Sequence, residues 1–281
     1  PNREYKDSVF VDLHSNDIVL REQAVMDIYN ALHDKKIDKK DKIRFMKLEH
    51  VFFHKVRNDV SFIVEGKILV LLEHQSTINE NMPYRCLEYS VAMFLSQMKP
   101  RDKFLPSPVE FFTPEFYIIY NGTSPYPARK ELRLSKSFKE QTDNPQLELI
   151  VTVININHPD NKEFLDSCPL LKGYKKLVDK VELYKRLYKN EGYILAIEEC
   201  IREGIEIADY LRRRTLEVVD MFSLEYKFYE ELEAYRSDGI QQGMQQGMQQ
   251  GMQQGMQRGS YDTKIETAKR LLDMGLSLIH I

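Results

Sequence analysis

Two carboxylates and one amide stand beside the most apolar part of the chain. Asp59 opens the segment DVSFIV, and Glu73 and Gln75 follow the apolar run at 68–72 with no turn residue between. Hard oxygen ligands of this kind suit Mg²⁺ or Mn²⁺, which take one or two carboxylates and keep several waters. A metal bound there would position and acidify a water for attack on phosphorus. The alternative interpretation is that both acids are solvent-facing strand ends.

The spacing of these residues depends on a β-hairpin. Period-two apolar residues, a Glu-Gly-Lys turn and a second apolar run predict a hairpin within 51–75. If residues 65–67 form the turn, Asp59 lies opposite Glu73 on the same face of the sheet. A two-residue turn would instead pair Asp59 with Leu72 and send the two carboxylates to opposite faces. We take the three-residue turn as the expected register.

The flanking sequence predicts the elements that position the hairpin. Helix-spaced apolar residues predict helices over 17–33 and 84–98, the second of them opened by Pro83. Apolar runs predict strands over 115–122 and 147–156. The order helix, hairpin, helix, strand, strand describes an α/β sandwich, in which one helix crosses over a mixed sheet.

The second half of the chain is predicted to be helical. Helix-spaced apolar positions recur beyond Asn161, and six glycines then stand four residues apart between 239 and 259. A four-residue period drifts by about 40° per repeat on a helix, and each interior glycine costs roughly 1 kcal/mol against alanine. We therefore expect the repeat to be frayed or disordered when alone. It is either a low-complexity tether before a short last helix, which we favour, or a self-association helix.

These patterns predict three parts in the chain. Residues 1–160 form the α/β domain that carries the candidate site, and residues 161–238 form a helical extension. Residues 239–281 form the Gly/Gln/Met repeat and the short terminal helix.

Composition excludes several protein classes. No stretch approaches the eighteen apolar residues of a membrane span and no secretory segment follows the polar start, so we expect a cytoplasmic protein. The three cysteines stand far apart without a CxxC motif and are expected to be buried. A net charge of −3 gives no global attraction to nucleic acid. Three local basic clusters are interpreted as solvated faces: Lys35, Lys36, Lys39, Lys40 and Lys42; Arg129, Lys130, Arg133, Lys136 and Lys139; Arg212, Arg213 and Arg214.

A long segment around the hairpin resembles a known family. The stretch RNDVSFIVEGKILVLLEHQSTINENMPYRCLEY is similar to the signature of the Rpn family of recombination-promoting nucleases and transposase-type proteins, the YhgA-like group. This family is a branch of the PD-(D/E)XK nuclease superfamily. The segments KDSVF, EFYIIYNGTSPYP and LIVTVININ and the glycine-every-four tail also resemble it. The combination of EHQS with Pro83 and Arg85 is far more specific than a bare D…ExK pattern.

The resemblance implies a restriction-endonuclease-like fold and cleavage of DNA phosphodiester bonds that depends on Mg²⁺ or Mn²⁺. Asp59 and Glu73 match the two acids that would hold the metal, and Gln75 stands in the slot that lysine usually fills. Asp7 matches an acid on the first helix of the family. Arg85 either supplies positive charge to the phosphate or makes a surface salt link.

Gln75 is the main departure from the superfamily pattern, because a neutral amide donates hydrogen bonds but lacks the charge of lysine. The resemblance implies DNA as the partner, and the repeat adds a possible second copy of the chain. The rival hypothesis is a catalytically impaired relative that binds DNA or self-associates. A sugar or protein hydrolase with paired carboxylates is a third hypothesis, which the absence of tryptophan, and so of an aromatic sugar platform, disfavours.

Overall fold

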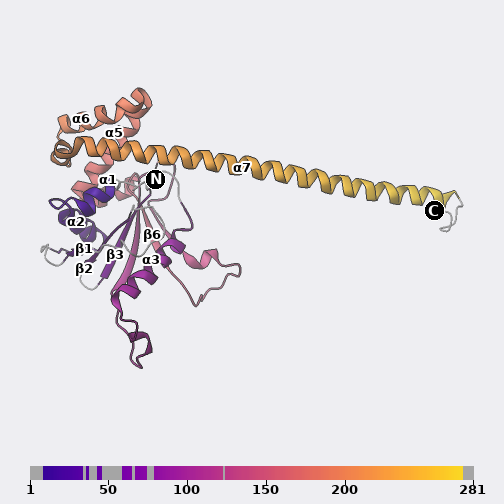
Figure 1. Ribbon diagram of the computed structural model, residues 1–281, viewed down its shortest axis with the longest axis horizontal. Helices are drawn as coiled ribbons and strands as arrows, with labels where there is room; N and C mark the ends of the chain where they lie inside the picture. Colours follow the sequence, from indigo (N-terminus) through magenta and orange to yellow (C-terminus); the bar gives the residue numbers. More distant parts are fainter. Residues whose placement is uncertain are drawn as a thin grey trace. The chain divides into compact units, whose positions relative to one another are not determined.

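An antiparallel hairpin joined to parallel strands forms the centre of the protein. The computed structural model describes residues 9–33, 36–37, 43–45, 59–64, 67–74, 79–122 and 124–274. Within them, one sheet has the strand order β1-β2-β3-β4-β6-β5 (Figure 1). The bounds are β1 (Ile43–Phe45), β2 (Asp59–Val64), β3 (Lys67–His74), β4 (Thr113–Tyr120), β5 (Arg129–Arg133) and β6 (Ile150–Asn155).

The sheet is mixed, with parallel strands in its middle and antiparallel pairs toward both of its edges. The strands β1, β2 and β3 are antiparallel neighbours, β3, β4 and β6 are parallel, and β5 is antiparallel to β6. The helix α3 (Met82–Gln97) connects β3 with its parallel neighbour β4, as a parallel pair requires. The mixed α/β sheet flanked by helices, expected from the sequence, is therefore confirmed.

The expected three-residue hairpin turn is wrong. Val64 pairs with Lys67, which leaves two residues between the strands, and Asp59 pairs with Leu72. The sequence misled because the apolar run of β3 is continuous, so alternation of apolar and polar residues does not fix its register. The backbone therefore places positions 59 and 73 on opposite faces of the sheet.

Helices cover both faces of the sheet. On one face, α3 packs through Met82, Cys86 and Met93 against the apolar residues of β4, β5 and β6. On the other face, α2 (Arg21–His33) approaches β4, where His33 Nε2 lies 2.7 Å from Glu115 Oε2. Figure 1 shows α1 and α2 away from α3, with the strands between them. The short N-terminal elements are α1 (Val9–Val11) and the π-helix η1 (Asp12–Asn16).

The helical extension belongs, as far as Leu224, to the same compact unit as the sheet. The chain divides into Pro1–Leu224 and Glu225–Ile281, whereas the sequence predicted a boundary near residue 160. The two longer helices of the extension pack on each other, and α5 also contacts α2. The bounds are α4 (Lys162–Asp166), α5 (Pro169–Tyr188), α6 (Gly192–Glu203) and α7 (Ala208–Asp273), the last of which crosses the division.

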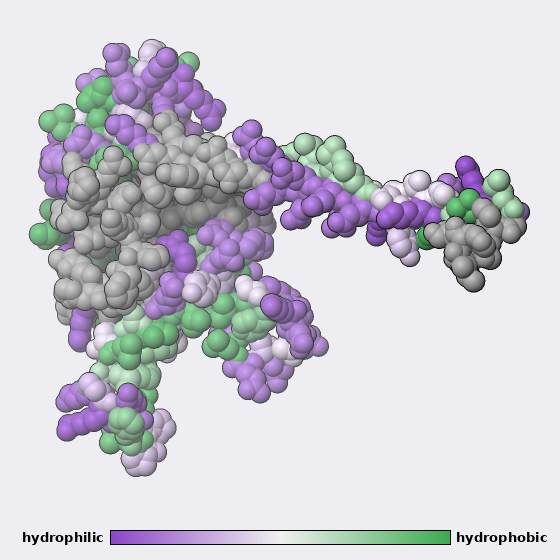
Figure 2. All heavy atoms as spheres, turned by 45° about the vertical axis from the view of Figure 1, so that its right-hand side comes forward, coloured by the Kyte–Doolittle hydropathy of each residue, from purple (hydrophilic) through white to green (hydrophobic). Residues whose placement is uncertain are grey.

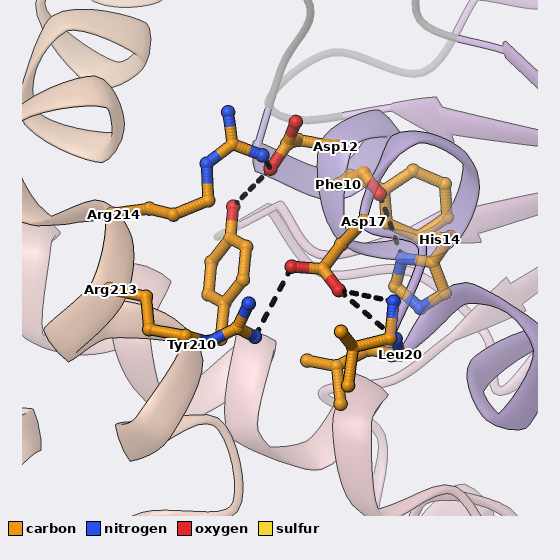
Figure 3. Close-up of polar contacts among 9 residues, drawn as sticks. Phe10, Asp12, His14, Asp17, Leu20, Tyr210, Arg213 and Arg214 are labelled. Carbon is orange, nitrogen blue, oxygen red and sulfur yellow. Dashed lines mark hydrogen bonds and ion pairs between the residues drawn. The ribbon is translucent and has the colours of Figure 1, made fainter.

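Buried acids near the N-terminus join the extension to the α/β part (Figure 3). Asp12 accepts hydrogen bonds from Tyr210 and Arg214 of α7, and Asp17 pairs with Arg213 at 3.3 Å. Both acids are almost fully buried. The backbone of α7 is kinked at Arg214, one of the residues that reach these acids.

The glycine repeat is helical in the second unit. It forms part of α7, which continues to Asp273, so the expected tether with a separate short helix is corrected. Met and Gln are good helix formers and fill three of every four positions, which offsets part of the cost of glycine. A Cβ atom added at any of the five glycines from 243 to 259 would meet no atom within 4 Å.

Several apolar side chains remain exposed in the first unit. Figure 2 shows hydrophobic residues gathered in the lower part of the view, over α3 and the connection that follows it. They include Val91, Leu95, Phe104 and Leu105, each more than half exposed. Every helix within the described ranges is too short or too polar to cross a lipid bilayer.

Candidate active site at the carboxyl edge of the sheet

Three parallel strands end together beside the candidate residues. The register aligns Glu73 with Ile119 and His74 with Tyr120 of β4, and Tyr120 in turn with Asn155 of β6. Ligands of open α/β sheets bind outside the carboxyl ends of the parallel strands. Glu73 is therefore placed where this kind of sheet forms binding sites, because it is the penultimate residue of β3.

The two expected metal ligands share an edge of the sheet but differ in face. Asp59 is the first residue of the antiparallel strand β2, so it enters the sheet at the edge where β3 ends. Position 73 lies on the face of Ile119 and Tyr117, and position 59 on the face of Leu72 and Ile118. The regular ladder therefore places positions 59 and 73 on opposite faces, and not on the same face as in the expected register.

Other residues named from the sequence are only partly placed. Asp7 and Gln75 lie outside the described residues. Arg85 lies on the first turns of α3, where Nη2 is 3.3 Å from the hydroxyl of Tyr89 and Nη1 is 3.6 Å from the sulfur of Met82. These contacts orient the guanidinium along its own helix, and its role toward a phosphate stays a prediction.

Asn121 is a candidate site residue that the sequence pattern did not reveal. It directly follows β4, and it is 8% exposed. Within the described part of the chain, neither its Oδ1 nor its Nδ2 has a hydrogen-bond partner. Leaving a buried polar group unpaired costs about 1–3 kcal/mol, so such groups require an explanation. The Asn-Gly pair reads as a turn signal, which hid a polar residue that follows a buried parallel strand.

Neighbouring asparagines at the same edge have clear structural roles. Asn155 Nδ2 donates to the Tyr126 carbonyl at 2.8 Å, and Asn157 Nδ2 donates to the Gly122 carbonyl at 3.0 Å. Asn161 Nδ2 donates to backbone carbonyls at 2.6 and 2.9 Å. These three side chains hold the turns of the edge together. Asn121 stands among them without an equivalent contact in the described chain.

The backbone around Asn121 is closely packed. A Cβ atom at Gly122 would lie 2.5 Å from the hydroxyl oxygen of Tyr120, so a larger residue would require the buried tyrosine ring to move. The Tyr120 hydroxyl donates to the Ser124 carbonyl at 3.0 Å. Ile156 N donates to the Tyr120 carbonyl at 3.0 Å, which fixes the end of β4 against the segment after β6.

A second polar cluster lies toward the amino ends of β3 and β4. Glu115 accepts hydrogen bonds from Lys67, His33 and Tyr117. Partial burial acts to raise the pKa of Glu115, but the hydrogen bonds from Lys67 and His33 outweigh it, so the pKa is lowered. Burial and the neighbouring Glu115 raise the pKa of Tyr117. These groups satisfy one another and join α2 to the sheet, which is a structural role.

Several of the described basic residues pair with acids. Lys130 pairs with Glu80 at 2.7 Å, and Arg133 pairs with Glu131 at 2.6 Å. In the last cluster, Arg213 and Arg214 pair with acids near the N-terminus. Arg214 is partly buried, so the interpretation as a solvated face is wrong for it, whereas Arg213 stays exposed. The three cysteines are buried, as expected.

No preformed metal cluster stands in the described chain. Among those residues, no group of three His, Cys, Asp or Glu side chains is arranged to hold a metal ion. At the carboxyl edge the candidate donors are the carboxylate of Glu73 and neutral amides, which are hard oxygen ligands that suit Mg²⁺. No protein-family model, no curated protein and no solved structure matches the chain.

Proposed function

We propose that the chain is a Mg²⁺-dependent or Mn²⁺-dependent DNA endonuclease of the Rpn type with a restriction-endonuclease-like fold. The observation that carries the proposal is the position of Glu73 at the carboxyl edge of β3, where β3, β4 and β6 run parallel. The resemblance of the EHQS segment to the Rpn signature supports the same edge. The unpaired buried amide of Asn121 beside it supports a ligand at this place.

The residues at the carboxyl edge of the sheet have different roles in the proposed reaction. Glu73 holds the metal, and on the resemblance alone Asp59 shares it. A metal held there would supply an acidified water and positive charge that stabilises the leaving oxygen. During hydrolysis the water oxygen bonds to phosphorus, one phosphorus–oxygen ester bond breaks, and a proton from the water ends on the leaving oxygen, which gives a phosphate and a hydroxyl. Gln75 donates a hydrogen bond to the water or to the scissile phosphate.

One observation favours the rival, a catalytically impaired DNA-binding or self-associating relative. The β2–β3 register separates positions 59 and 73 by face, and a regular hairpin of this kind does not chelate one ion with both acids. Gln75 adds no positive charge to compensate. The two functions differ in metal uptake, because only the nuclease requires a divalent ion at the edge.

Metal binding separates the two candidates. Calorimetric titration of the full chain with Mn²⁺ should show one binding site. The variant Glu73→Gln should lack this site. The matched control is Glu115→Gln, which alters a carboxylate on the same face of the sheet but toward the opposite edge. If the parent takes up no Mn²⁺, or if Glu73→Gln leaves the site intact, the proposed active site is wrong.

A further inference from the structure

The position of Asn121 relative to Glu73 follows from the strand register. The parallel pairing of Glu73 with Ile119 places Asn121 two residues beyond Ile119, on the same face of the sheet. Strand spacing and rise put the Cα atoms of positions 73 and 121 roughly 8 Å apart. This separation leaves room for one phosphate group between a carboxylate-bound ion and an amide.

The side chain of Asn121 is costly to the protein as it stands. It is 8% exposed, and both of its polar atoms are unpaired within the described residues. A buried amide without partners destabilises the folded state, whereas an apolar side chain of similar size does not. Native proteins retain such groups at functional sites, where a ligand supplies the missing partner.

A structural role for this amide is not supported by its surroundings. Asn155, Asn157 and Asn161 hold the turns of the same edge through hydrogen bonds to backbone carbonyls. The backbone after β4 is held by Gly122, whose carbonyl accepts the hydrogen bond from Asn157. The turn therefore keeps its shape without a contribution from the side chain of Asn121.

We infer that Asn121 binds a non-bridging oxygen of the DNA phosphate at this edge, an inference that rests on the proposed function. Its Nδ2 donates to the phosphate oxygen, and its Oδ1 accepts a hydrogen bond from a water. The amide supplies a hydrogen-bond donor without adding a charge beside Glu73. The closely packed turn holds the amide in place before the substrate arrives, which lowers the cost of binding.

The test compares Asn121→Leu with a matched control at the same edge. The control Asn157→Ala removes an asparagine whose side chain donates a hydrogen bond to the Gly122 carbonyl. Three quantities are measured for the full chain: the thermal midpoint, the affinity for a DNA duplex in Ca²⁺, and nicking of plasmid DNA in Mg²⁺. For Asn121→Leu we expect an equal or higher midpoint and about tenfold weaker DNA binding, the size of one hydrogen bond to a charged group. For Asn157→Ala we expect a lower midpoint and, at temperatures well below that midpoint, a smaller loss of DNA affinity than in Asn121→Leu.

Each outcome decides the inference. A midpoint that falls in Asn121→Leu as it does in Asn157→Ala shows that the amide is structural and overturns it. Parental DNA affinity in Asn121→Leu also overturns it. If the parent binds DNA but does not cleave it, the nuclease proposal fails, while the affinity comparison still decides the role of Asn121. If the parent neither binds nor cleaves DNA, both proposals fall.

Discussion

The hydroxyl of Tyr210 donates a hydrogen bond to the buried carboxylate of Asp12, with 2.7 Å between the two oxygens. The two residues lie 198 positions apart, and Arg214 pairs with the same carboxylate. Burial and the charge of Asp12 raise the pKa of Tyr210, so the phenol stays protonated and continues to donate. This contact ties the helical extension to the first elements of the chain.

Asp12→Ala should destabilise the first unit by about 3 kcal/mol, because it leaves Arg214 and Tyr210 without their partner in a poorly solvated place. Urea denaturation followed by tyrosine fluorescence measures the loss. The matched control is Asp209→Ala, which removes an exposed carboxylate that pairs with Arg212. It should cost less than about 1 kcal/mol. Equal losses in the two variants would contradict a structural role for the Asp12 contact.

Stability should fall on mild acidification because of His14. The ring is fully buried, and burial lowers its pKa to about 4, outweighing the hydrogen bond to the Phe10 carbonyl, which acts to raise it. The unfolded chain has a His pKa near 6.5 and binds more protons between the two values, so the stabilising contribution is full above pH 6.5 and is lost toward pH 4. At pH 5 the loss is about 2 kcal/mol.

The His14 contribution is measured by comparing the parent with His14→Phe. Urea denaturation at pH 7, 6 and 5 gives the free energy of unfolding for both proteins. The difference between them should shrink or reverse as the pH falls, because the phenylalanine variant has no proton to take up at this position. A constant difference across these pH values would show that His14 is not buried in its neutral form.

Most of the fold was predictable from local sequence pattern. The helices over 17–33 and 84–98 and the strands over 115–122 and 147–156 follow from helix-spaced residues, apolar runs and Pro83, and the structure confirms each within a few residues. The strand β5 was missed. Its sequence RKELR has four charged residues around one buried leucine, and it was taken for a basic cluster because an edge strand needs few apolar side chains.

The geometry of the candidate site was not predictable in the same way. The register of β2 and β3 depends on the length of a short turn, and a continuous apolar run carries no alternation of apolar and polar residues to fix it. Asn121 was missed because its significance lies in what surrounds it. Burial without partners is a property of the folded chain and has no signature in the sequence.

The glycines of the repeat should be replaceable by alanine. A Cβ atom at Gly243, Gly247 or Gly251 would meet nothing within 4 Å, and the same holds for the last two glycines of the row. Changing all five to alanine should raise helical content, because each change favours the helix by up to about 1 kcal/mol. Circular dichroism at 222 nm measures the gain.

Gly204 provides the control for the repeat, because its backbone is left-handed with a φ of 64°. Gly204→Ala should lower stability. Sedimentation of the five-alanine variant tests the self-association hypothesis. If the parent is an oligomer and the variant is not, the glycine row permits close contact between copies, and the repeat helix takes part in self-association.

Gln75 tests whether a charge is missing from the proposed site. Gln75→Lys should cleave DNA at least as fast as the parent, since an ammonium also donates a hydrogen bond and adds a charge that phosphoryl transfer can use. Gln75→Ala should be clearly slower. Both rates are measured as Mg²⁺-dependent nicking at the same salt concentration, because DNA affinity depends strongly on salt. Parental activity in Gln75→Ala would show that the side chain of Gln75 takes no part in cleavage.

Asp59→Asn tests the role that rests on the resemblance alone. If Asp59 shares the metal despite its place opposite Leu72, the variant should lose more than about a hundredfold in nicking rate, beyond the loss for a residue that only orients a ligand. Its thermal midpoint should not fall. A nicking rate near that of the parent would remove Asp59 from the site and leave Glu73 as its acid.

Metal-dependent cleavage that relies on Glu73 is tested by nicking of supercoiled plasmid with the parent and with Glu73→Gln, each in Mg²⁺ and in EDTA. The proposed function predicts open-circular product only for the parent in Mg²⁺. Glu73→Gln should give none while it keeps the parental thermal midpoint, since the change preserves the shape of the side chain at the end of β3. Equal nicking by the parent and Glu73→Gln, or no nicking by the parent in Mg²⁺, would contradict a metal-dependent nuclease built on Glu73.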